Sequence, residues 1–403
     1  MSSWAEYTTG ERVKVLRGPM SQHALSEAAD VSIALVQKLE QNRGHVSLAY
    51  LMKISEALGT DLSVVLGEQA PRASMDRDER AGLRAIAAAV HGTAMGEIGG
   101  VEAPTLGDAQ TALDQVFADY WSGRYDALGV TLPKLLWESR ALYDSCNIDE
   151  RFAAGGIMSD AYQLAGHYAN NHGLRDLAYA ATSYGKGVAG DIGDELRVAR
   201  WASVLSWVFL RDGKPKNAMR AAEKAAMAIE PRFSEADDTR IAVYGNLMTN
   251  AAVAASRGGA TPDRARDFIS QAHAAAARMS GNGDVIPFGA IFGKPAATTQ
   301  AVSVALALGD VGRALTLIDG TRLREDLMQP SSVARYRLDI ALAKTEVRQW
   351  DAAIEALDDA LRIAPAFTRS QALSGVLVNR LGDAKAAKVR KLARQIGVPL
   401  RLA

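Results

Sequence analysis

The chain has 403 residues, of which 48% are hydrophobic and 23% are charged, and its formal net charge is +0. This length allows two or three domains with hydrophobic cores, and the composition excludes a fibre or a disordered tail. Zero net charge excludes a global basic field, so any nucleic-acid binding has to come from a local patch.

The number of cysteines and the length of the hydrophobic stretches indicate the cellular compartment in which the protein resides. Cys146 is the single cysteine, which excludes a disulfide within the chain and a four-thiolate metal site. No apolar N-terminal segment precedes a cleavage site, and charged residues interrupt the alanine-rich stretches. We therefore expect a cytoplasmic protein without membrane contact.

The first 67 residues predict five short helices; the first four begin with a capping residue, and the last is a turn from Ser63 to Leu66. The predicted starts are Thr8 in the capping-box pattern TTGE, Ser21, Ser32, Ser47 and Ser63. The predicted core residues are Val13, Leu16, Leu25, Ala28, Val36, Leu39, Leu51, Ile54 and Leu58. This pattern is typical of a compact all-helical unit.

The third predicted helix, within ADVSIALVQKLEQN (residues 29–42), has an unusual outer face. With Ser32 as the N-cap, Val36 and Leu39 point inward. The opposite face carries Ile33, Ala34, Gln37 and Lys38. An isoleucine and an alanine between a glutamine and a lysine indicate a surface that contacts something other than water.

A linker and a long helical region follow. Residues 67–75 (GEQAPRASM) have no apolar period, and a helix predicted from DRDERAGLRAIAAAV ends near residue 100. We expect an N-terminal domain over residues 1–67, a linker with a helix over 68–104, and a helical domain over 105–403. Strand patterns are almost absent from the last of these regions.

A repeating pattern runs through residues 105–403: a helix, a glycine or polar turn, and an alanine or leucine five residues after the turn. The copies are Gly123/Leu128, Gly173/Ala178, Gly213/Ala218, Gly309/Ala314, Arg348/Ala353 and a looser one from Gly259 to Ala265. Turns roughly 40 to 50 residues apart are typical of stacked helix pairs. The sequence therefore predicts an all-α protein with a helical-repeat body.

Two segments carry a family resemblance. MSQHALSEAADVSIALVQKLEQN and SLAYLMKISEALGTDLSVVLG resemble the helix-turn-helix of the xenobiotic-response-element (XRE) family, to which lambda repressor and Cro belong. Residues 335–365, with Ala341, Ala353, Ala360 and Pro365, resemble a tetratricopeptide repeat. The whole chain is similar to actinobacterial regulators that join these two parts, and its layout is similar to the peptide-sensing Rap/Rgg/PlcR/PrgX group. The implied fold is a five-helix lambda-repressor-like domain followed by a tetratricopeptide-like α-solenoid.

The resemblance implies roles for residues of the first domain. Ile33, Ala34, Gln37 and Lys38 would contact DNA bases in the major groove. Arg17, Gln22, Gln41, Asn42 and Arg43 would contact phosphates. The alternative is that the third helix only packs, with its polar residues in water.

Charge makes a single domain a weak DNA binder. The basic residues up to Gly67 are Arg12, Lys14, Arg17, Lys38, Arg43 and Lys53, six in all, against the seven acidic residues Glu6, Glu11, Glu27, Asp30, Glu40, Glu56 and Asp61. Few phosphate charges are neutralised, so non-specific affinity is modest. We expect a homodimer on a two-fold operator.

The resemblance also implies a ligand site on the concave wall of the repeats, formed by the first helix of each pair. The register of the turns places Asp160, Gln163, His167, Asn170, Arg200, Ser203, Trp207, Asn250 and Arg335 there. We expect Gln163, His167, Asn170, Arg200, Trp207 and Asn250 to bind a peptide or small molecule, and Trp201 to lie in the core. The alternatives are a solvated groove or a surface covered by a partner subunit. The interrupting segment VIPFGAIFGKPAAT (residues 285–298) either crosses the groove mouth or plugs a gap between helix pairs.

Catalysis and metal binding lack a supporting pattern. Cys146, His167 and His172 have no third partner or anion hole, and no histidine pair has metal-ligand spacing. We expect no enzymatic activity and no cofactor. The predicted function is a DNA-binding transcriptional regulator whose operator affinity changes with a ligand. The alternative is a DNA-binding regulator whose repeats are a protein-interaction scaffold without a small ligand.

Overall fold

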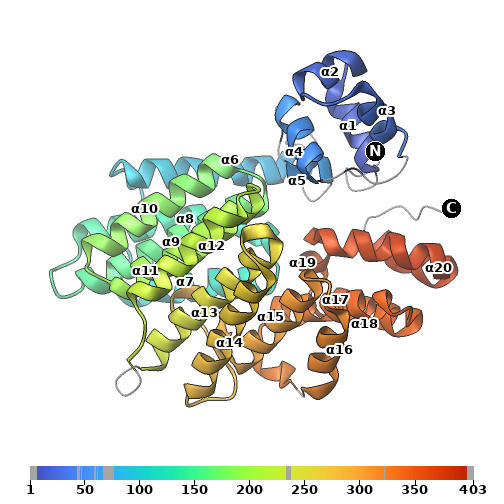
Figure 1. The fold of residues 1–403 in the computed structure, drawn as a ribbon. Helices are drawn as coiled ribbons and strands as arrows, with labels where there is room; N and C mark the ends of the chain where they lie inside the picture. Colours follow the sequence, from blue (N-terminus) through green and yellow to red (C-terminus); the bar gives the residue numbers. More distant parts are fainter. Residues whose placement is uncertain are drawn as a thin grey trace.

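Nearly all regular structure in the described residues is helical, as predicted (Figure 1). The computed structural model describes residues 7–42, 46, 48–58, 60, 62–66, 77–232, 237–321 and 323–396. A small N-terminal unit and a larger helical body make up the molecule. No helix of the described ranges is long and apolar enough to cross a bilayer.

The N-terminal unit contains five short helices. They are α1 (Thr9–Arg17), α2 (Gln22–Ala28), α3 (Ile33–Glu40), α4 (Leu48–Ala57) and α5 (Leu62–Leu66). The Thr8 capping box forms, with Glu11 N donating to Thr8 Oγ1 at 2.8 Å and Thr8 N donating to Glu11 Oε2 at 2.6 Å. Ser21 and Ser32 cap α2 and α3 as predicted, whereas Ser47 lies outside the described residues.

The core of this unit is small and apolar. The side chains of Val13, Leu25, Val36, Ile54 and Val65 are fully buried and pack together. The predicted inward position of Ala28 is wrong: Ala28 is exposed and Ala29 is buried, because α2 ends at Ala28 and the chain turns inward at the next residue.

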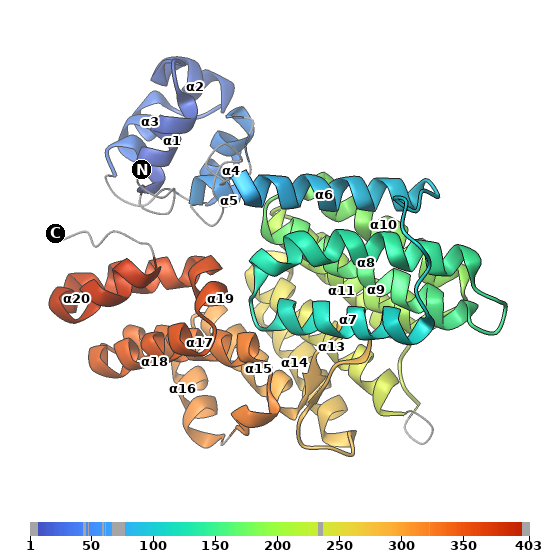
Figure 2. The same ribbon diagram turned by 180° about the vertical axis from the view of Figure 1, so that it is seen from behind.

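The body is a succession of helix pairs that follow one another through space in sequence order (Figure 2). The pairs are α7 (Leu106–Trp121) with α8 (Tyr125–Ser145), α9 (Arg151–Asn171) with α10 (Arg175–Asp191), α11 (Glu195–Arg211) with α12 (Pro215–Ala228), α13 (Asp238–Ala254) with α14 (Pro262–Arg278), α15 (Lys294–Ala307) with α16 (Val311–Gly320), and α17 (Pro330–Glu346) with α18 (Trp350–Ile363). The chain ends in α19 (Pro365–Ser370) and α20 (Ala372–Ile396), and short turns of helix are η3 (Ala255–Gly259), η4 (Pro287–Gly289) and η5 (Glu325–Leu327).

The first helices of successive pairs touch one another directly. α7 contacts α9, α9 contacts α11, and the series continues through α13 and α15 to α17. We call the six first helices, α7, α9, α11, α13, α15 and α17, together the inner layer. Each second helix packs between its own partner and the first helix of the next pair.

The helix expected within the linker belongs to the body. α6 (Arg77–Ala94) packs against α8 and α10. Its residues Leu83, Ile86, Ala89 and Val90 are buried in the same core as the first helix pairs. α6 is therefore packed as part of the helical body.

The turns of the predicted repeat have the backbone that glycine favours. The φ angles are +75° at Gly123, +74° at Gly173, +69° at Gly213, +77° at Gly309 and +59° at Arg348. The residues five positions later, Leu128, Ala178, Ala218, Ala314 and Ala353, are all fully buried. Small side chains at most of these positions allow the two helices of a pair to approach closely.

The longest non-helical connection of the body joins α14 to α15. It contains the antiparallel strands β1 (Asp284–Val285) and β2 (Phe292–Gly293), which pair Asp284 with Gly293 and Val285 with Phe292. The turn η4 lies between them. We call residues 284–293 the hairpin loop.

The N-terminal unit approaches the body at Gly213. A Cβ on Gly213, in the turn between α11 and α12, would lie 3.0 Å from the ε-carbon of Met52 in α4. Gly213 thus leaves room for a side chain of the N-terminal unit.

Arg348 allows a test of the preference for glycine at these turns. Its backbone has a left-handed φ of +59°, which is strained for any residue that carries a side chain. The variant Arg348→Gly should raise the free energy of unfolding by about 0.5 to 1 kcal/mol, since the strain is relieved and the exposed arginine side chain is lost without cost. The matched variant Gly309→Ala should lower it by about 1 kcal/mol, because no atom lies within 4 Å of the added Cβ and only backbone strain acts. Thermal or urea unfolding measures the free energy of both variants. If both are as stable as the unchanged protein, the preference for glycine at these turns is contradicted.

Candidate DNA-binding face and inner layer of the body

The outer face of α3 is open to solvent. Ile33 is 39% exposed, and Ala34, Gln37 and Lys38 are exposed beside it. Val36 and Leu39 are buried on the other side of the same helix. The residues predicted to contact bases therefore share one accessible face.

Arg17 and Gln22 do not point freely into solvent. Arg17 Nε donates to Glu40 Oε1 at 2.7 Å, and Gln22 Nε2 donates to Glu40 Oε2 at 2.7 Å. Burial alone would raise the pKa of Glu40, but these hydrogen bonds and the charge of Arg17 lower it. The cluster joins the end of α1, the start of α2 and the end of α3, so it holds α3 at a fixed angle.

The remaining predicted phosphate contacts follow α3. Gln41 and Asn42 are exposed, and Asn42 has a φ of +54°, a conformation that asparagine tolerates. Arg43 lies outside the described residues. Contacts of all five predicted residues with phosphate stay predictions.

The predicted ligand residues do not line an open groove. Gln163, Asn170, Arg200 and Asn250 are buried, and the hairpin loop lies against part of the layer that carries them. Asn170 accepts a hydrogen bond from Arg175 at 2.9 Å at the turn after α9. Trp207 lies near Arg257, whose guanidinium carbon is 6.0 Å from the ring centre.

The turn η4 covers Arg200. Arg200 Nη2 donates to the carbonyl of Gly289 at 3.2 Å and lies 3.5 Å from His167 Nε2. Burial lowers the pKa of His167 to about 3, so this imidazole is neutral at physiological pH. Gly289 lies so close to Gln163 and Phe117 that a Cβ would collide with both.

Arg197, three residues before Arg200 on α11, is fully paired. Its Nη2 lies 3.1 Å from Asp160 Oδ2 on α9, and its Nη1 lies 2.6 Å from Asp194 Oδ2. The guanidinium also lies over the Phe288 ring, 4.2 Å from its centre. The ion pairs of Asp160 thus connect two first helices beside the hairpin loop.

A chain of amides connects the next part of the layer to the loop. Asn246 Nδ2 donates to the carbonyl of Ile291 at 2.9 Å, and Ser203 Oγ donates to Asn246 Oδ1 at 2.8 Å. Asn250 Nδ2 donates to Ser203 Oγ and, at 3.2 Å, to Asn246 Oδ1. Asn250 reaches the loop only through these neighbours.

Phe292 anchors one end of the hairpin loop. Its ring is fully buried against Gly245 of α13, where any Cβ would collide with it. For residues 285–298 the sequence left two possibilities, a loop across the groove mouth or a plug between helix pairs. Phe292 packs as a plug against α13, whereas Phe288 lies on the inner layer beneath Arg197. Trp201 is buried as expected and donates to Ser159 Oγ at 3.0 Å.

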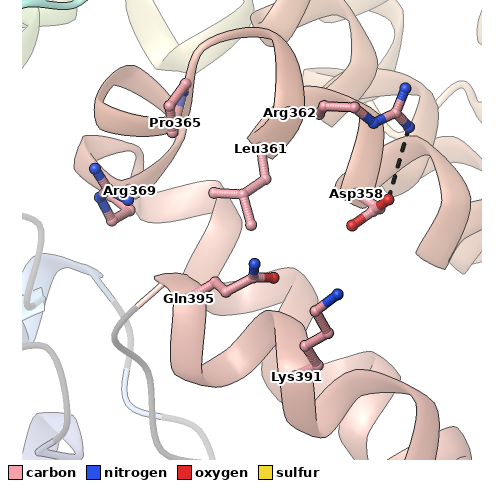
Figure 3. Close-up of a pocket in the computed structure, with 7 residues that line it drawn as sticks. All are labelled: Asp358, Leu361, Arg362, Pro365, Arg369, Lys391 and Gln395. Atoms are coloured by element: carbon pink, nitrogen blue, oxygen red, sulfur yellow. Dashed lines mark ion pairs between the residues drawn. The ribbon is translucent and has the colours of Figure 1, made fainter.

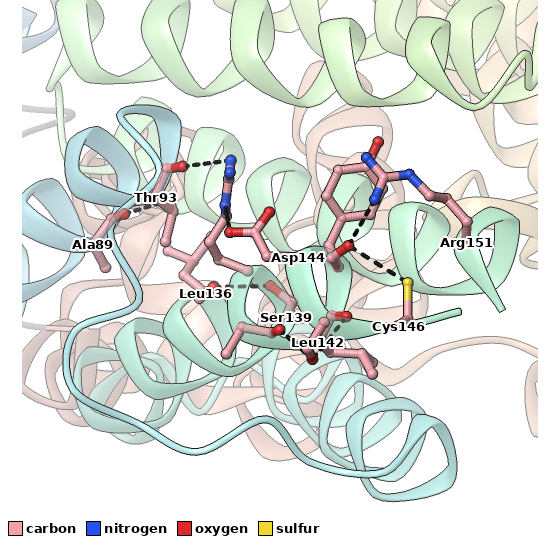
Figure 4. A network of polar contacts seen from close by, with 12 residues as sticks. Ala89, Thr93, Leu136, Ser139, Leu142, Asp144, Cys146 and Arg151 are labelled. Carbon is pink, nitrogen blue, oxygen red and sulfur yellow. Dashed lines mark hydrogen bonds and ion pairs between the residues drawn. The ribbon is translucent and has the colours of Figure 1, made fainter. Parts of the chain in front are cut away.

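Cys146 lies at the C-terminal end of α8, apart from the inner layer (Figure 4). Its thiol donates to the carbonyl of Tyr143 at 3.5 Å, and Arg151 Nη1 donates to the same oxygen at 3.1 Å. His167 and His172 contact Arg200 and the carbonyl of Tyr168, respectively, in the contacts described. These three residues therefore have separate neighbours.

A pocket near the C-terminal end of the body contains none of the predicted ligand residues (Figure 3). It is lined by Asp358, Leu361, Arg362, Pro365, Arg369, Lys391 and Gln395. Arg362 and Asp358, four residues apart on α18, form an ion pair at 3.6 Å along one wall of the pocket. The pocket lies between α18, α19 and α20, and its lining combines charged side chains with Leu361 and Pro365.

Sequence reasoning missed two residues of the inner layer that touch the loop, Arg197 and Asn246, and one residue of the loop itself, Gly289. Arg197 and Asn246 lie one helical turn before the predicted Arg200 and Asn250, so helical spacing was an available signal. Gly289 has no such signal, because its role depends on a carbonyl that only the folded loop places.

Comparisons with known proteins place the N-terminal unit. A model of the helix-turn-helix family matches residues 20–65, and this part of the chain is an XRE-type helix-turn-helix domain. No curated protein matches the sequence.

Two solved structures are similar over nearly the full length. The apo form of ComR from S. thermophilus is 12% identical, with 95% of this chain and 98% of that chain covered and a TM-score of 0.21. The apo form of the competence regulator ComR from Streptococcus vestibularis is 13% identical, with 97% and 98% covered and a TM-score of 0.24.

Asp284 of the hairpin loop gives a pH-dependent prediction. Burial raises its pKa to about 6, although Ala296 N donates to Oδ1 at 3.0 Å, and Oδ2 has no partner among the described residues. The folded state therefore binds more protons than the unfolded state between about pH 4 and 6, and it loses stability as the pH rises through this range.

The variant Asp284→Asn removes this buried charge and keeps an acceptor for Ala296. It should raise the free energy of unfolding by about 1 to 2 kcal/mol at pH 8, with a gain that shrinks toward pH 4. The control Asp267→Asn, at an exposed position on α14, should change little at either pH. Unfolding curves across this pH range measure the difference, and a pH-independent effect of Asp284→Asn would contradict the assignment.

Proposed function

We propose that this protein is a cytoplasmic transcriptional regulator rather than an enzyme, and that α3 reads an operator in the major groove. The observation that carries the proposal is the open α3 face within a helix-turn-helix unit, on which an isoleucine and an alanine lie beside Gln37 and Lys38. Gln37 can bond adenine, Lys38 can reach guanine acceptors, and Ile33 or Ala34 can cover a thymine methyl.

Several basic residues of the unit are committed to its own groups. Arg17 pairs with Glu40, Lys53 pairs with Asp30 at 2.7 Å, and the buried Arg12 reaches the carbonyl of Val65 at 3.4 Å. Few charges are left to neutralise phosphates, so non-specific binding would be weak. This supports a homodimer that reads two half-sites.

We also propose that the body is a tetratricopeptide-like solenoid whose inner layer binds a peptide or small-molecule effector. The recurring left-handed turns and buried small residues support the first part. Buried polar side chains that face a loop, in place of an apolar core, support the second. A ligand that prefers one arrangement of the body would change operator affinity by linkage.

Base contact by α3 predicts a loss of specific binding in Gln37→Ala and Lys38→Ala. Each should weaken binding to a selected sequence by about 1 to 3 kcal/mol without lowering the melting temperature, because both side chains are exposed. The sequence is obtained by selecting duplexes from a random library with the full chain, and affinities are measured by fluorescence anisotropy.

The control for the lost charge is Lys216→Ala, at an exposed position on α12. It should bind the selected duplex as the unchanged protein does. If Gln37→Ala and Lys38→Ala also bind normally, α3 is not the recognition helix.

Dimerisation is tested separately. Light scattering should give twice the mass of the 42.9 kDa chain, and selected duplexes should contain two half-sites with centres about 10 bp, or a multiple of this, apart. A monomer both free and on DNA would refute the two-fold arrangement.

A further inference from the structure

The inner layer contains buried hydrogen-bond donors that lack acceptors. Arg200 is 3% exposed, and neither its Nε nor its Nη1 has a partner among the described residues. Gln163 is 2% exposed, and its Nε2 is likewise without a partner there. Buried polar groups are nearly always hydrogen-bonded, so three unused donors beside one another indicate a missing acceptor.

The charge of Arg200 is not balanced by a nearby dedicated anion. His167 is neutral, and Asp160 is held by Arg197. Tyr120, whose ring stacks on His167 at 5.6 Å, keeps its proton because burial raises its pKa. Burial correspondingly lowers the pKa of Arg200 to about 10, which leaves it charged at physiological pH.

The hairpin loop supplies only a partial substitute for an anion. One carbonyl, that of Gly289, accepts from Nη2 of Arg200. The preceding residue, Phe288, has a φ of +52°, which is strained for a side chain of this size, and its ring is held under Arg197. A carboxylate accepts two parallel N–H bonds from a guanidinium and binds more strongly than a neutral carbonyl.

We propose that Arg200 and Gln163 form a binding site for a carboxylate that follows an aromatic group, and that the Phe288–Gly289 turn occupies this site in the absence of ligand. The ligand carboxylate replaces the Gly289 carbonyl, and its aromatic group replaces the Phe288 ring over Arg197. Phe292 stays in its place on Gly245, so only the turn has to move. The inference rests on the proposed effector function and names the chemistry of the effector.

The loop itself defines a probe. In acetyl-Val-Ile-Pro-Phe-Gly with a free C-terminus, the carboxylate occupies the position of the Gly289 carbonyl. The matched peptide amide has the same shape without the charge. Acetyl-Phe-Gly, as acid and amide, distinguishes a small aromatic acid from a longer peptide as the source of the carboxylate.

Binding is measured by calorimetry with the full chain and with Phe288→Ala, which removes the ring that competes for Arg197. The pentapeptide acid should bind Phe288→Ala about tenfold more tightly than the amide does. It should bind the unchanged protein more weakly than Phe288→Ala, because the turn must first leave. In the double variant Phe288→Ala/Arg200→Met, acid and amide should bind alike.

Three results would overturn the proposal. The first is equal affinity of acid and amide for Phe288→Ala. The second is a preference for the acid that survives Arg200→Met. The third is no binding of either acid to Phe288→Ala up to about 1 mM.

Stability separates a binding arginine from a structural one. Arg197→Met should lower the melting temperature, because it leaves Asp160 buried and unpaired. Arg200→Met, three residues away on the same helix, should leave it unchanged or raise it, because it removes a buried charge with unused donors. An equal loss in both variants would make Arg200 structural and would refute the site.

Operator affinity, measured without peptide, keeps the two proposals distinguishable. If Phe288→Ala binds the selected duplex but shows no preference for the acid, the carboxylate site fails and the DNA-binding proposal stands. If the preference is present and no duplex is selected, the site stands and the regulator proposal fails.

Discussion

The body depends on the close approach of the two helices in each pair. Fully buried residues five positions after each turn, mostly alanine, permit it, because they add little side-chain volume between the helices. The left-handed turn residue then returns the chain directly, without a long loop. Pairs of this kind leave their first helices in contact with one another, which produces the inner layer.

The inner layer carries several polar side chains among its buried apolar ones. On the first helices, Asp160 and Arg200 are buried and Arg197 and Asn246 are half-buried, so each of them needs a hydrogen-bonding partner. Two kinds of partner are present. Arg197 and Asp160 satisfy each other, whereas Arg200 and Asn246 depend on carbonyls of the hairpin loop. The loop is therefore part of the hydrogen bonding of the layer, although it comes from a distant part of the chain.

Arg197 and Arg200 of α11 differ in how completely their guanidinium groups are paired. Arg197 has carboxylates on two sides and an aromatic ring beneath it, so its position is determined several times over. Arg200 has one carbonyl and one long contact to a neutral imidazole. Arg197 thus holds two helices together, whereas Arg200, three residues later, has hydrogen-bond donors without acceptors among the described residues.

In the N-terminal unit the comparable element is Glu40. This carboxylate, at the end of α3, accepts hydrogen bonds from Arg17 at the end of α1 and from Gln22 at the start of α2. These bonds fix the angle of α3, whose outer face is open. The arrangement accounts for the limited positive surface of the unit, because one of its few arginines is used internally. Specific contacts of α3 then have a larger share in any DNA binding than charge has.

The sequence by itself determined the local features of this protein. Capping residues at Thr8, Ser21 and Ser32, the spacing of Val36 and Leu39, and the small residues after each turn act within a few positions of one another, so helices, turns and the exposed α3 face follow from them. Only the tertiary structure decided which polar residues of the first helices are paired within the protein and which have donors left to bind a ligand. Arg197 has a local partner in Asp194, but the contacts that most distinguish it from Arg200 come from Asp160 and Gly289, which are 37 and 89 residues away from Arg197 and Arg200, respectively. Long-range partners of this kind leave no periodic signal in the sequence, because each depends on one contact that forms only when the loop lies on the inner layer.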